Sequence, residues 1–291
     1  MTHYTINNLG YHVEERGTGN PVVLLHGFTG STETWRPLMS ELEKGFRVIA
    51  IDLPGHGQTE APPNVDRYRM EAVADGIAGL LEQLDAVPAH WLGYSMGGRI
   101  ALYFACRFPL FVRSLLLESA SPGILDTDDR VARAKQDFEL AQRIEQEGVT
   151  HFVDYWQNLP LFDTQQRLSE ETRTALRTQR LRNSATGLAN SLRGMSTGVQ
   201  PELWSELSNL GMPVQLIAGK DDRKFVDINR RMAAKIPNSR LMVIPNSGHA
   251  VHLEAAGLYS DLVLDFFSDT SKHGGQHLPN AKKGNEYERG D

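Results

Sequence analysis

Cysteine and long apolar runs are nearly absent from this sequence. Its 291 residues include a single cysteine, Cys106, which cannot form a disulfide within the chain, so nothing requires an oxidising compartment. No uninterrupted apolar run approaches the ~20 residues of a membrane-spanning helix. The first residues, Met-Thr-His-Tyr, also lack the basic start of a secretory signal. We therefore expect a cytoplasmic protein without a membrane partner.

The sequence also lacks an excess of basic residues. It has 30 Lys and Arg against 36 Asp and Glu, for a net charge of -6, which argues against the basic surface that a nucleic acid needs. Glycine loops with the Walker or dinucleotide-binding spacing are missing too. We expect no nucleic-acid partner, no metal and no cofactor, and a chain that is a monomer or a weak homo-oligomer.

Short apolar runs are present, and they alternate with longer helical patterns. This alternation is typical of an α/β fold with a mainly parallel sheet flanked by helices. Helices are expected over residues 70–84, 228–236 and 253–267, where apolar residues recur on one face. The predicted strands, each apolar through most of its length as a strand covered on both faces should be, are Pro21–Leu25, Arg47–Ile51, His90–Gly93, Ser114–Leu117, Val214–Ala218 and Arg240–Ile244.

One long segment without a strand pattern interrupts this alternation. Residues 124–200 are helical in pattern and contain nine Arg but only one Lys. We interpret them as a helical cap inserted into a core formed by residues 1–123 and 201–268. Residues 269–291 are polar and have no periodicity, so we expect a disordered tail.

The candidate nucleophile is Ser95, in the sequence Gly-Tyr-Ser-Met-Gly-Gly at residues 93–98. This G-x-S-x-G pattern occurs where a predicted strand meets a predicted helix. A sharp turn at that point holds the serine hydroxyl clear of the sheet, and the small glycines let the helix approach the strand closely.

A serine hydroxyl is a poor nucleophile or base unless an imidazole accepts its proton and an acid orients that imidazole. Asp221 and Asp222 follow one predicted strand, and His249 follows the last one, in Asn-Ser-Gly-His. The order Ser, Asp, His is that of α/β-hydrolases. The residues alone leave both aspartates open, and His252 is the alternative to His249.

An oxyanion hole requires two backbone N–H groups that point at one position. Met96, directly after the serine, is the first candidate. Phe28 is the second, in the glycine-containing turn that follows the first predicted parallel strand. We expect His26 in this turn, and His56 in the turn Asp-Leu-Pro-Gly-His-Gly at residues 52–57, to be structural.

Four motifs together resemble the α/β-hydrolase superfamily, over residues 10 to 268. They are His-Gly-Phe at 26–28, Asp-x-Pro-Gly-His-Gly at 52–57, Gly-Tyr-Ser-Met-Gly-Gly at 93–98 and Asn-Ser-Gly-His at 246–249. A closer resemblance, to the 2-succinyl-6-hydroxy-2,4-cyclohexadiene-1-carboxylate synthases of menaquinone biosynthesis, rests on residues 93–99, 118–123, 156–162 and 219–225. The last of these ranges contains the pattern Gly-x-x-Asp-x-Lys-Phe.

The closer resemblance implies a lyase that eliminates pyruvate from an enolpyruvyl cyclohexene carboxylate, a small anionic substrate. It implies that Asp222 is the acid of the triad with Ser95 and His249, and that the triad works as a general base. Arginines suit such a substrate because their planar guanidinium groups bind carboxylates with two hydrogen bonds. The substrate-binding residues implied by the resemblance are Tyr94, Arg99, Arg133, Trp156 and Arg180.

Several alternatives remain open. Arg130 can replace Arg133 in the alignment, Arg177 or Arg182 can replace Arg180, and Trp156 can be a core aromatic of the cap. The same triad also suits a serine hydrolase of esters or of carbon–carbon bonds. A ligand receptor without activity is a third interpretation, which the presence of all three triad residues disfavours.

Overall fold

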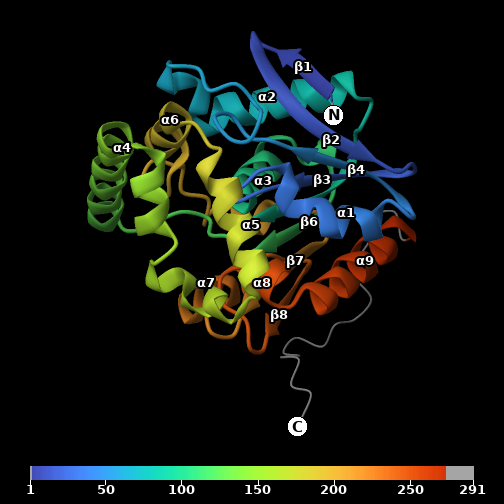
Figure 1. The fold of residues 1–291 in the computed structure, drawn as a ribbon. Coiled ribbons are helices and arrows are strands. Elements are labelled where there is room, and N and C mark those ends of the chain that lie inside the picture. Colours follow the sequence, from blue (N-terminus) through green and yellow to red (C-terminus); the bar gives the residue numbers. More distant parts are fainter. Residues whose placement is uncertain (1, 273–291) are drawn as a thin grey trace.

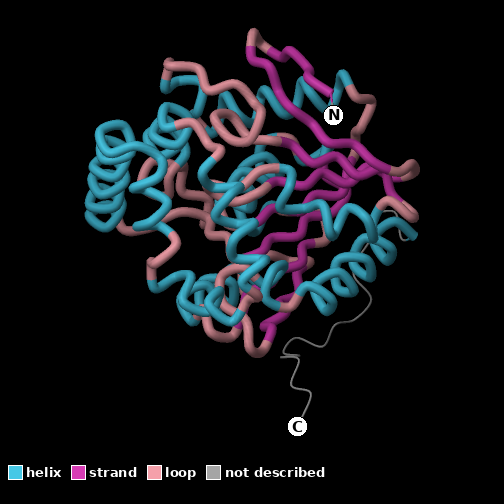
Figure 2. Tube along the Cα trace, in the orientation of Figure 1, coloured by secondary structure: helices cyan, strands magenta, loops and turns pink. Residues whose placement is uncertain are grey.

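The computed structural model describes residues 2–272, and its centre is an eight-stranded sheet (Figure 2). The order of the strands across the sheet is β1-β2-β4-β3-β5-β6-β7-β8. The strands are β1 (Thr2–Ile6), β2 (Leu9–Arg16), β3 (Asn20–Leu25), β4 (Phe46–Ile51), β5 (Ala89–Tyr94), β6 (Val112–Glu118), β7 (Val214–Gly219) and β8 (Ser239–Ile244).

The six predicted strands are confirmed as β3 to β8, and all of them pair in parallel. The sequence pattern missed β1 and β2, which pair with each other and with β4 in an antiparallel manner. Strand β1 is mostly exposed, and β2 alternates apolar with polar residues from Tyr11 to Glu14 and then ends in Glu15 and Arg16. Neither therefore has the continuous apolar run by which a doubly covered strand is recognised.

Helices cover both faces of the sheet (Figure 1). They are α1 (Arg36–Leu42), α2 (Met70–Gln83), α3 (Met96–Arg107), α4 (Thr127–Trp156), α5 (Glu170–Leu181), α6 (Ala185–Met195), α7 (Arg223–Ala233), α8 (Val251–Glu254) and α9 (Ala256–Lys272). Short 3-10 helices lie at Thr32–Trp35, Val65–Tyr68, Pro109–Phe111, Pro160–Arg167 and Glu206–Asn209. Two of the predicted helices thus differ: α7 begins five residues earlier than expected, and Ala255, which is not helical, separates α8 from α9.

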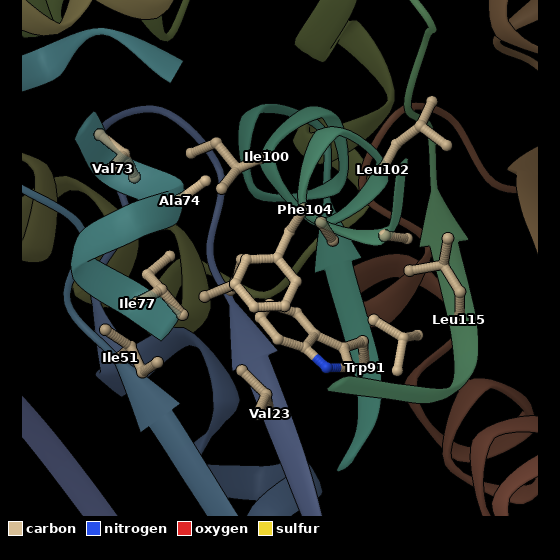
Figure 3. Packing of buried hydrophobic residues seen from close by; sticks show 14 of the residues in the cluster. Val23, Ile51, Val73, Ala74, Ile77, Trp91, Ile100, Leu102, Phe104 and Leu115 are labelled. Carbon is tan, nitrogen blue, oxygen red and sulfur yellow. The ribbon is translucent and has the colours of Figure 1, made fainter. Parts of the chain in front are cut away.

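Alternate residues of each central strand enter two separate hydrophobic clusters. One cluster packs against α2 and α3 and includes Trp91 of β5. The Trp91 ring stacks on Phe104 of α3 with 4.2 Å between ring centroids, beside Ile77 of α2 (Figure 3). The other cluster packs against α1 and α9 and includes Leu92. Both faces of the sheet are thereby closed to water, and its carboxyl edge is left for the loops.

The segment between β6 and β7 contains α4, α5 and α6. In Figure 1, α4 and α6 lie side by side at the left, and α5 lies nearer the centre of the view. The structure describes no strand between residues 124 and 200. Helix α4 consists of two helical parts, because Gly148 between them has non-helical dihedral angles (φ 82, ψ 168). Its side chains share a small cluster with those of α6. The division of the chain into a core and a cap domain stays a prediction.

The predicted boundary of the tail is wrong by four residues, because α9 continues to Lys272. Thr270 is buried and its hydroxyl donates to the Phe266 carbonyl at 2.8 Å, while the hydroxyl of Ser271 lies 2.9 Å from Nε2 of His90 in β5. Contacts with a distant strand stabilise this last turn, and they leave no local sequence pattern. The other residues of the predicted tail lie outside the described part of the chain.

None of the helices within residues 2–272 has both the length and the apolar character that crossing a membrane requires.

Candidate active site

Ser95 lies in a tight turn between β5 and α3, with a backbone φ of 50 that a non-glycine residue rarely adopts. Glycines on either side allow this turn. A Cβ atom on Gly93 would lie 2.5 Å from the carbonyl oxygen of Gly97, and one on Gly97 would lie 2.3 Å from that of Leu25. The sequence Gly-Tyr-Ser-Met-Gly therefore forms a strained elbow that presents the Ser95 hydroxyl at the carboxyl edge of the sheet.

His249 joins Ser95 to an acid. Its Nε2 lies 3.0 Å from the Ser95 hydroxyl oxygen, and its Nδ1 lies 2.7 Å from an Asp222 carboxylate oxygen. Asp222 follows β7 and caps α7, where its other oxygen accepts a hydrogen bond from the N–H of Phe225. Asp221 instead forms an ion pair with exposed Arg167, with 2.8 Å between a carboxylate oxygen and Nη1. The geometry thus distinguishes two adjacent aspartates that the residues alone left open.

The alternative base, His252, has a different partner. Its Nδ1 lies 2.9 and 3.0 Å from the two carboxylate oxygens of buried Glu118, and one of these oxygens also accepts from the His252 backbone N–H. Its ring packs edge-on against Tyr94, with 4.5 Å between the centroids. His252 therefore connects the end of β6 to the loop that carries His249, and makes no hydrogen bond to Ser95 among the described residues.

The two candidate oxyanion-hole residues both border the cavity in front of Ser95. Met96 is the first residue of α3, where a backbone N–H has no partner within the helix. Phe28 lies in a turn closed by a hydrogen bond from the Gly30 N–H to the Gly27 carbonyl, 3.0 Å long.

Two buried histidines hold the loops around this turn. His26 accepts a hydrogen bond from the Leu53 N–H through Nε2 at 3.1 Å, and its Nδ1 lies 2.8 Å from the Gly27 carbonyl. Nδ1 of His56 lies 3.1 Å from the Pro54 carbonyl. Burial lowers the pKa of His26, and it lowers that of His56 to about 3. Both rings are therefore neutral near pH 7, as loop-holding side chains are expected to be.

A cavity of about 1020 Å³ opens between the elbow and the segment of residues 124–200. This volume lies at the upper end of the range for small-molecule pockets. Most of the residues predicted for the site border it. They are Phe28, Tyr94, Ser95, Met96, Arg99, Arg133, Trp156 and His249.

Arg99 and Arg133 give part of this cavity a positive charge. Burial, together with a smaller effect of the nearby Arg133 charge, lowers the pKa of Arg99 to about 10. Arg99 donates to two neutral acceptors, the Met195 carbonyl at 2.6 Å and the Gln200 side chain at 2.7 Å. Arg133 is paired with Asp137, at 2.8 Å from Nε. Within residues 2–272, Arg99 has no carboxylate at ion-pair distance.

The cavity is not uniformly basic. Asp126 and Asp129, at the start of α4, border it as well. No group of three or more His, Cys, Asp or Glu side chains in the described range is placed to hold a metal ion.

Arg180 does not border the large cavity. It lines a small neighbouring pocket, donates to the Gln165 side-chain oxygen at 3.2 Å, and lies 5.4 Å from the centroid of the Phe162 ring. Tyr94 and Phe162 border both spaces and stand between them. Position along the sequence could not show this separation, because it depends on how α5 packs over the Pro160–Arg167 helix.

Sequence reasoning also missed residues that surround the site. Gln200 accepts the Arg99 hydrogen bond, Glu118 binds His252, and Ser119 borders the cavity beside the elbow. Glu118 and Ser119 follow a predicted parallel strand, and the carboxyl end of such a strand is where an α/β sheet places its site residues. That signal was available in the sequence. The sequence around Gln200 gave no such signal.

A model of the alpha/beta hydrolase fold matches residues 20–256. A Bacillus subtilis (strain 168) protein provisionally named 2-succinyl-6-hydroxy-2,4-cyclohexadiene-1-carboxylate synthase is 43% identical over 89% of this chain and 94% of its own length. The synthase of that name from Enterobacter sp. (strain 638) is 31% identical over 80% of this chain and 86% of its own. The chain belongs to this synthase family of α/β-hydrolases.

A solved structure leads to the same family. The structure of MenH from S. aureus superimposes with a TM-score of 0.86 and 33% sequence identity, over 93% of this chain and 100% of that chain. The fold and family resemblances noted in the sequence are therefore confirmed.

Proposed function

We propose that this protein eliminates pyruvate from 2-succinyl-5-enolpyruvyl-6-hydroxy-3-cyclohexene-1-carboxylate and releases 2-succinyl-6-hydroxy-2,4-cyclohexadiene-1-carboxylate. The observation that carries the proposal is the position of Arg99, which borders the same cavity as Ser95 and His249 without a carboxylate partner in residues 2–272. A guanidinium without a carboxylate partner, beside a hydrogen-bonded Ser-His-Asp arrangement, suits an anionic substrate that undergoes proton abstraction. The names of the family relatives support the same reaction.

The reaction is a balanced elimination across the ring. A proton leaves C2, its electron pair forms the C2–C3 double bond, the C3–C4 double bond moves to C4–C5, and the C5–O bond breaks. The enolpyruvyl group takes up a proton and leaves as pyruvate. Because C2 carries the succinyl carbonyl, its proton is acidic and the negative charge develops as an enolate.

Each residue of the candidate site has a role in this reaction. His249, oriented by Asp222, accepts the hydroxyl proton of Ser95 as Ser95 Oγ takes the proton from C2. The backbone N–H groups of Phe28 and Met96 stabilise the enolate oxygen. Arg99 and Arg133 bind substrate carboxylates, and Tyr94 and Trp156 border the ring.

Arg180 is not placed in the same space as Arg99 and Arg133. It lies behind Tyr94 and Phe162, so it reaches a substrate carboxylate only if these rings move.

The expected cytoplasmic location and the expected state of a monomer or weak homo-oligomer stay predictions.

The test compares two substrates. Purified protein is expected to release pyruvate rapidly from the enolpyruvyl cyclohexene carboxylate and to have little activity on a neutral aryl ester, which would leave Arg99 unpaired. Ser95→Ala and His249→Ala should each lower pyruvate release by a factor on the order of 10³ or more. Pyruvate is measured with a coupled assay, and mass spectrometry should find no acyl group on Ser95.

The serine-hydrolase alternative predicts the opposite pattern. Efficient turnover of the ester, an acylated Ser95 and no pyruvate would replace the elimination with hydrolysis.

A further inference from the structure

Ser119 has a strained backbone at the carboxyl end of β6. Its φ of 48 lies in the left-handed region, which costs a serine on the order of 1 kcal/mol or more. Two sheet hydrogen bonds hold the chain there. The Ser95 N–H donates to the Glu118 carbonyl at 2.8 Å, and the Ser119 N–H donates to the Ile217 carbonyl at 2.9 Å. The position of Ser119 between the strands that lead to Ser95 and Asp222 is therefore set by the sheet itself.

The hydroxyl of Ser119 has no hydrogen-bond partner among the described residues, although the residue is fully buried by the folded chain. A buried hydroxyl without a partner normally destabilises a protein. Ser119 borders the large cavity, as do Ser95 and His249. Ser119 is thus a residue of the cavity lining, near Ser95 and His249, whose hydroxyl the fold leaves without a partner.

The carboxylate of the preceding residue is engaged elsewhere, because Glu118 binds His252. Strained backbone and an unpaired hydroxyl are two separate costs at one residue, and neither improves the packing of the fold. Such costs persist where a bound molecule makes use of the group.

We infer that Ser119 contacts the substrate, and that its hydroxyl donates a hydrogen bond to an oxygen attached to the reacting ring. The ring must lie next to Ser95 for its C2 proton to be removed, and Ser119 is adjacent to Ser95 across the β5–β6 pairing. The carboxylate, hydroxyl and ether oxygens of this ring are all acceptors. The inference rests on the proposed elimination and adds to it a substrate-contacting residue that selects for an oxygen-bearing ring.

Two variants separate this role from a structural one. Ser119→Ala removes the unpaired hydroxyl, and Ser119→Gly also relieves the strain at positive φ. Both are expected to unfold at the same temperature as the unmodified protein or higher, yet to release pyruvate with kcat/KM about ten- to a hundredfold lower. Activity and stability should therefore change in opposite directions, which the loss of a structural residue does not produce.

Ser114→Ala is the matched control on the same strand. The Ser114 hydroxyl lies 2.8 Å from Nδ1 of buried His90, at the opposite end of β6, so its loss should lower the unfolding temperature and leave kcat/KM unchanged. Unaltered kcat/KM in either Ser119 variant overturns the inference, as does lower activity that accompanies lower stability in both. If the unmodified protein releases no pyruvate, the proposed function fails first, and the inference that rests on it fails with it.

Discussion

The hydrogen-bond partner decides what each buried histidine does. His249 lies between Ser95 and Asp222, His252 binds Glu118, and His26 accepts from a backbone N–H. The three imidazoles are chemically the same and all are buried. Only the first has a hydroxyl on one nitrogen and a carboxylate on the other, which is the arrangement that general-base chemistry needs.

Buried His90 predicts a loss of stability at acidic pH. Burial lowers its pKa to about 3, so the folded protein keeps it neutral while the unfolded chain takes up a proton near pH 6.5. The stability is complete above pH 6.5 and decreases as the pH falls toward 3. At pH 5 the loss should be about 2 kcal/mol relative to pH 7. His90→Gln, which stays neutral, should reduce this difference in urea unfolding.

An unchanged dependence in His90→Gln would mean that the ring takes up protons freely in the folded protein.

Arg133 and Arg130 provide a matched pair, because they lie on one helix and only Arg133 borders the cavity. Arg133→Gln should lower kcat/KM about thirtyfold through a lost charged hydrogen bond, whereas Arg130→Gln should not. Arg133→Gln also leaves buried Asp137 without its partner. Adding Asp137→Asn should restore the unfolding temperature but not the activity.

Equal losses from the Arg130 and Arg133 variants would contradict the placement of α4 over the cavity. Recovery of activity together with stability in the double variant would assign Arg133 to structure.

At the scale of elements, a break within α4 brings distant residues to one cavity. Arg133 lies on the first part of the helix and Trp156 at the end of the second, and both border the space in front of Ser95. An unbroken helix of 30 residues would be about 45 Å long, too long for both ends to reach one pocket. Gly148 permits the change of direction.

Gly148→Ala is therefore expected to destabilise the protein. A φ of 82 with a ψ of 168 is a conformation that essentially only glycine adopts, and forcing alanine into it costs about 1–3 kcal/mol. A Cβ atom there would meet no neighbour within 4 Å, so the loss reports backbone strain and not a clash. Denaturant unfolding measures this loss of stability.

Gly257→Ala in α9 is the comparison for Gly148. A Cβ atom at Gly257 would also meet nothing within 4 Å, but this residue is helical. The stability of the Gly257→Ala variant should match that of the unmodified protein or exceed it slightly. Equal behaviour of the two alanine variants would contradict a glycine-dependent break in α4.

At the scale of the whole molecule, α9 links the end of the described chain to the middle of the sheet. Thr270 and Ser271 contact His90 and Ser114, which lie between 156 and 181 residues earlier in the chain. Comparing a chain that ends at Ser268 with one that ends at Lys272 isolates this link. The shorter chain should be less stable by about 1–3 kcal/mol, because His90 loses a hydrogen-bond partner while buried.

Equal unfolding midpoints for the two chains would show that the last turn of α9 adds nothing. The comparison also tests the boundary predicted from the sequence, which placed the start of the tail directly after Ser268.

Local sequence patterns predicted a large part of this molecule. Continuous apolar runs identified β3 to β8, since a parallel strand is covered on both faces and needs no polar residue. The glycine-flanked Ser95 and its following helix identified the elbow, because only small neighbours permit that turn. The order of Ser95, Asp222 and His249 reflects the order of the strands they follow.

Other features depend on contacts between residues far apart in the sequence. The sequence alone could not place Arg180 behind Phe162, pair Glu118 with His252, or extend α9 toward His90, because each requires two elements to pack in one particular way. The strain and unpaired hydroxyl of Ser119 belong to this group too. The sequence by itself determined the six parallel strands of the sheet and the order of the candidate catalytic residues, which follow from local periodicity and turn sterics. The tertiary structure decided which side chains border the cavity, because burial and distance arise only when the chain is packed.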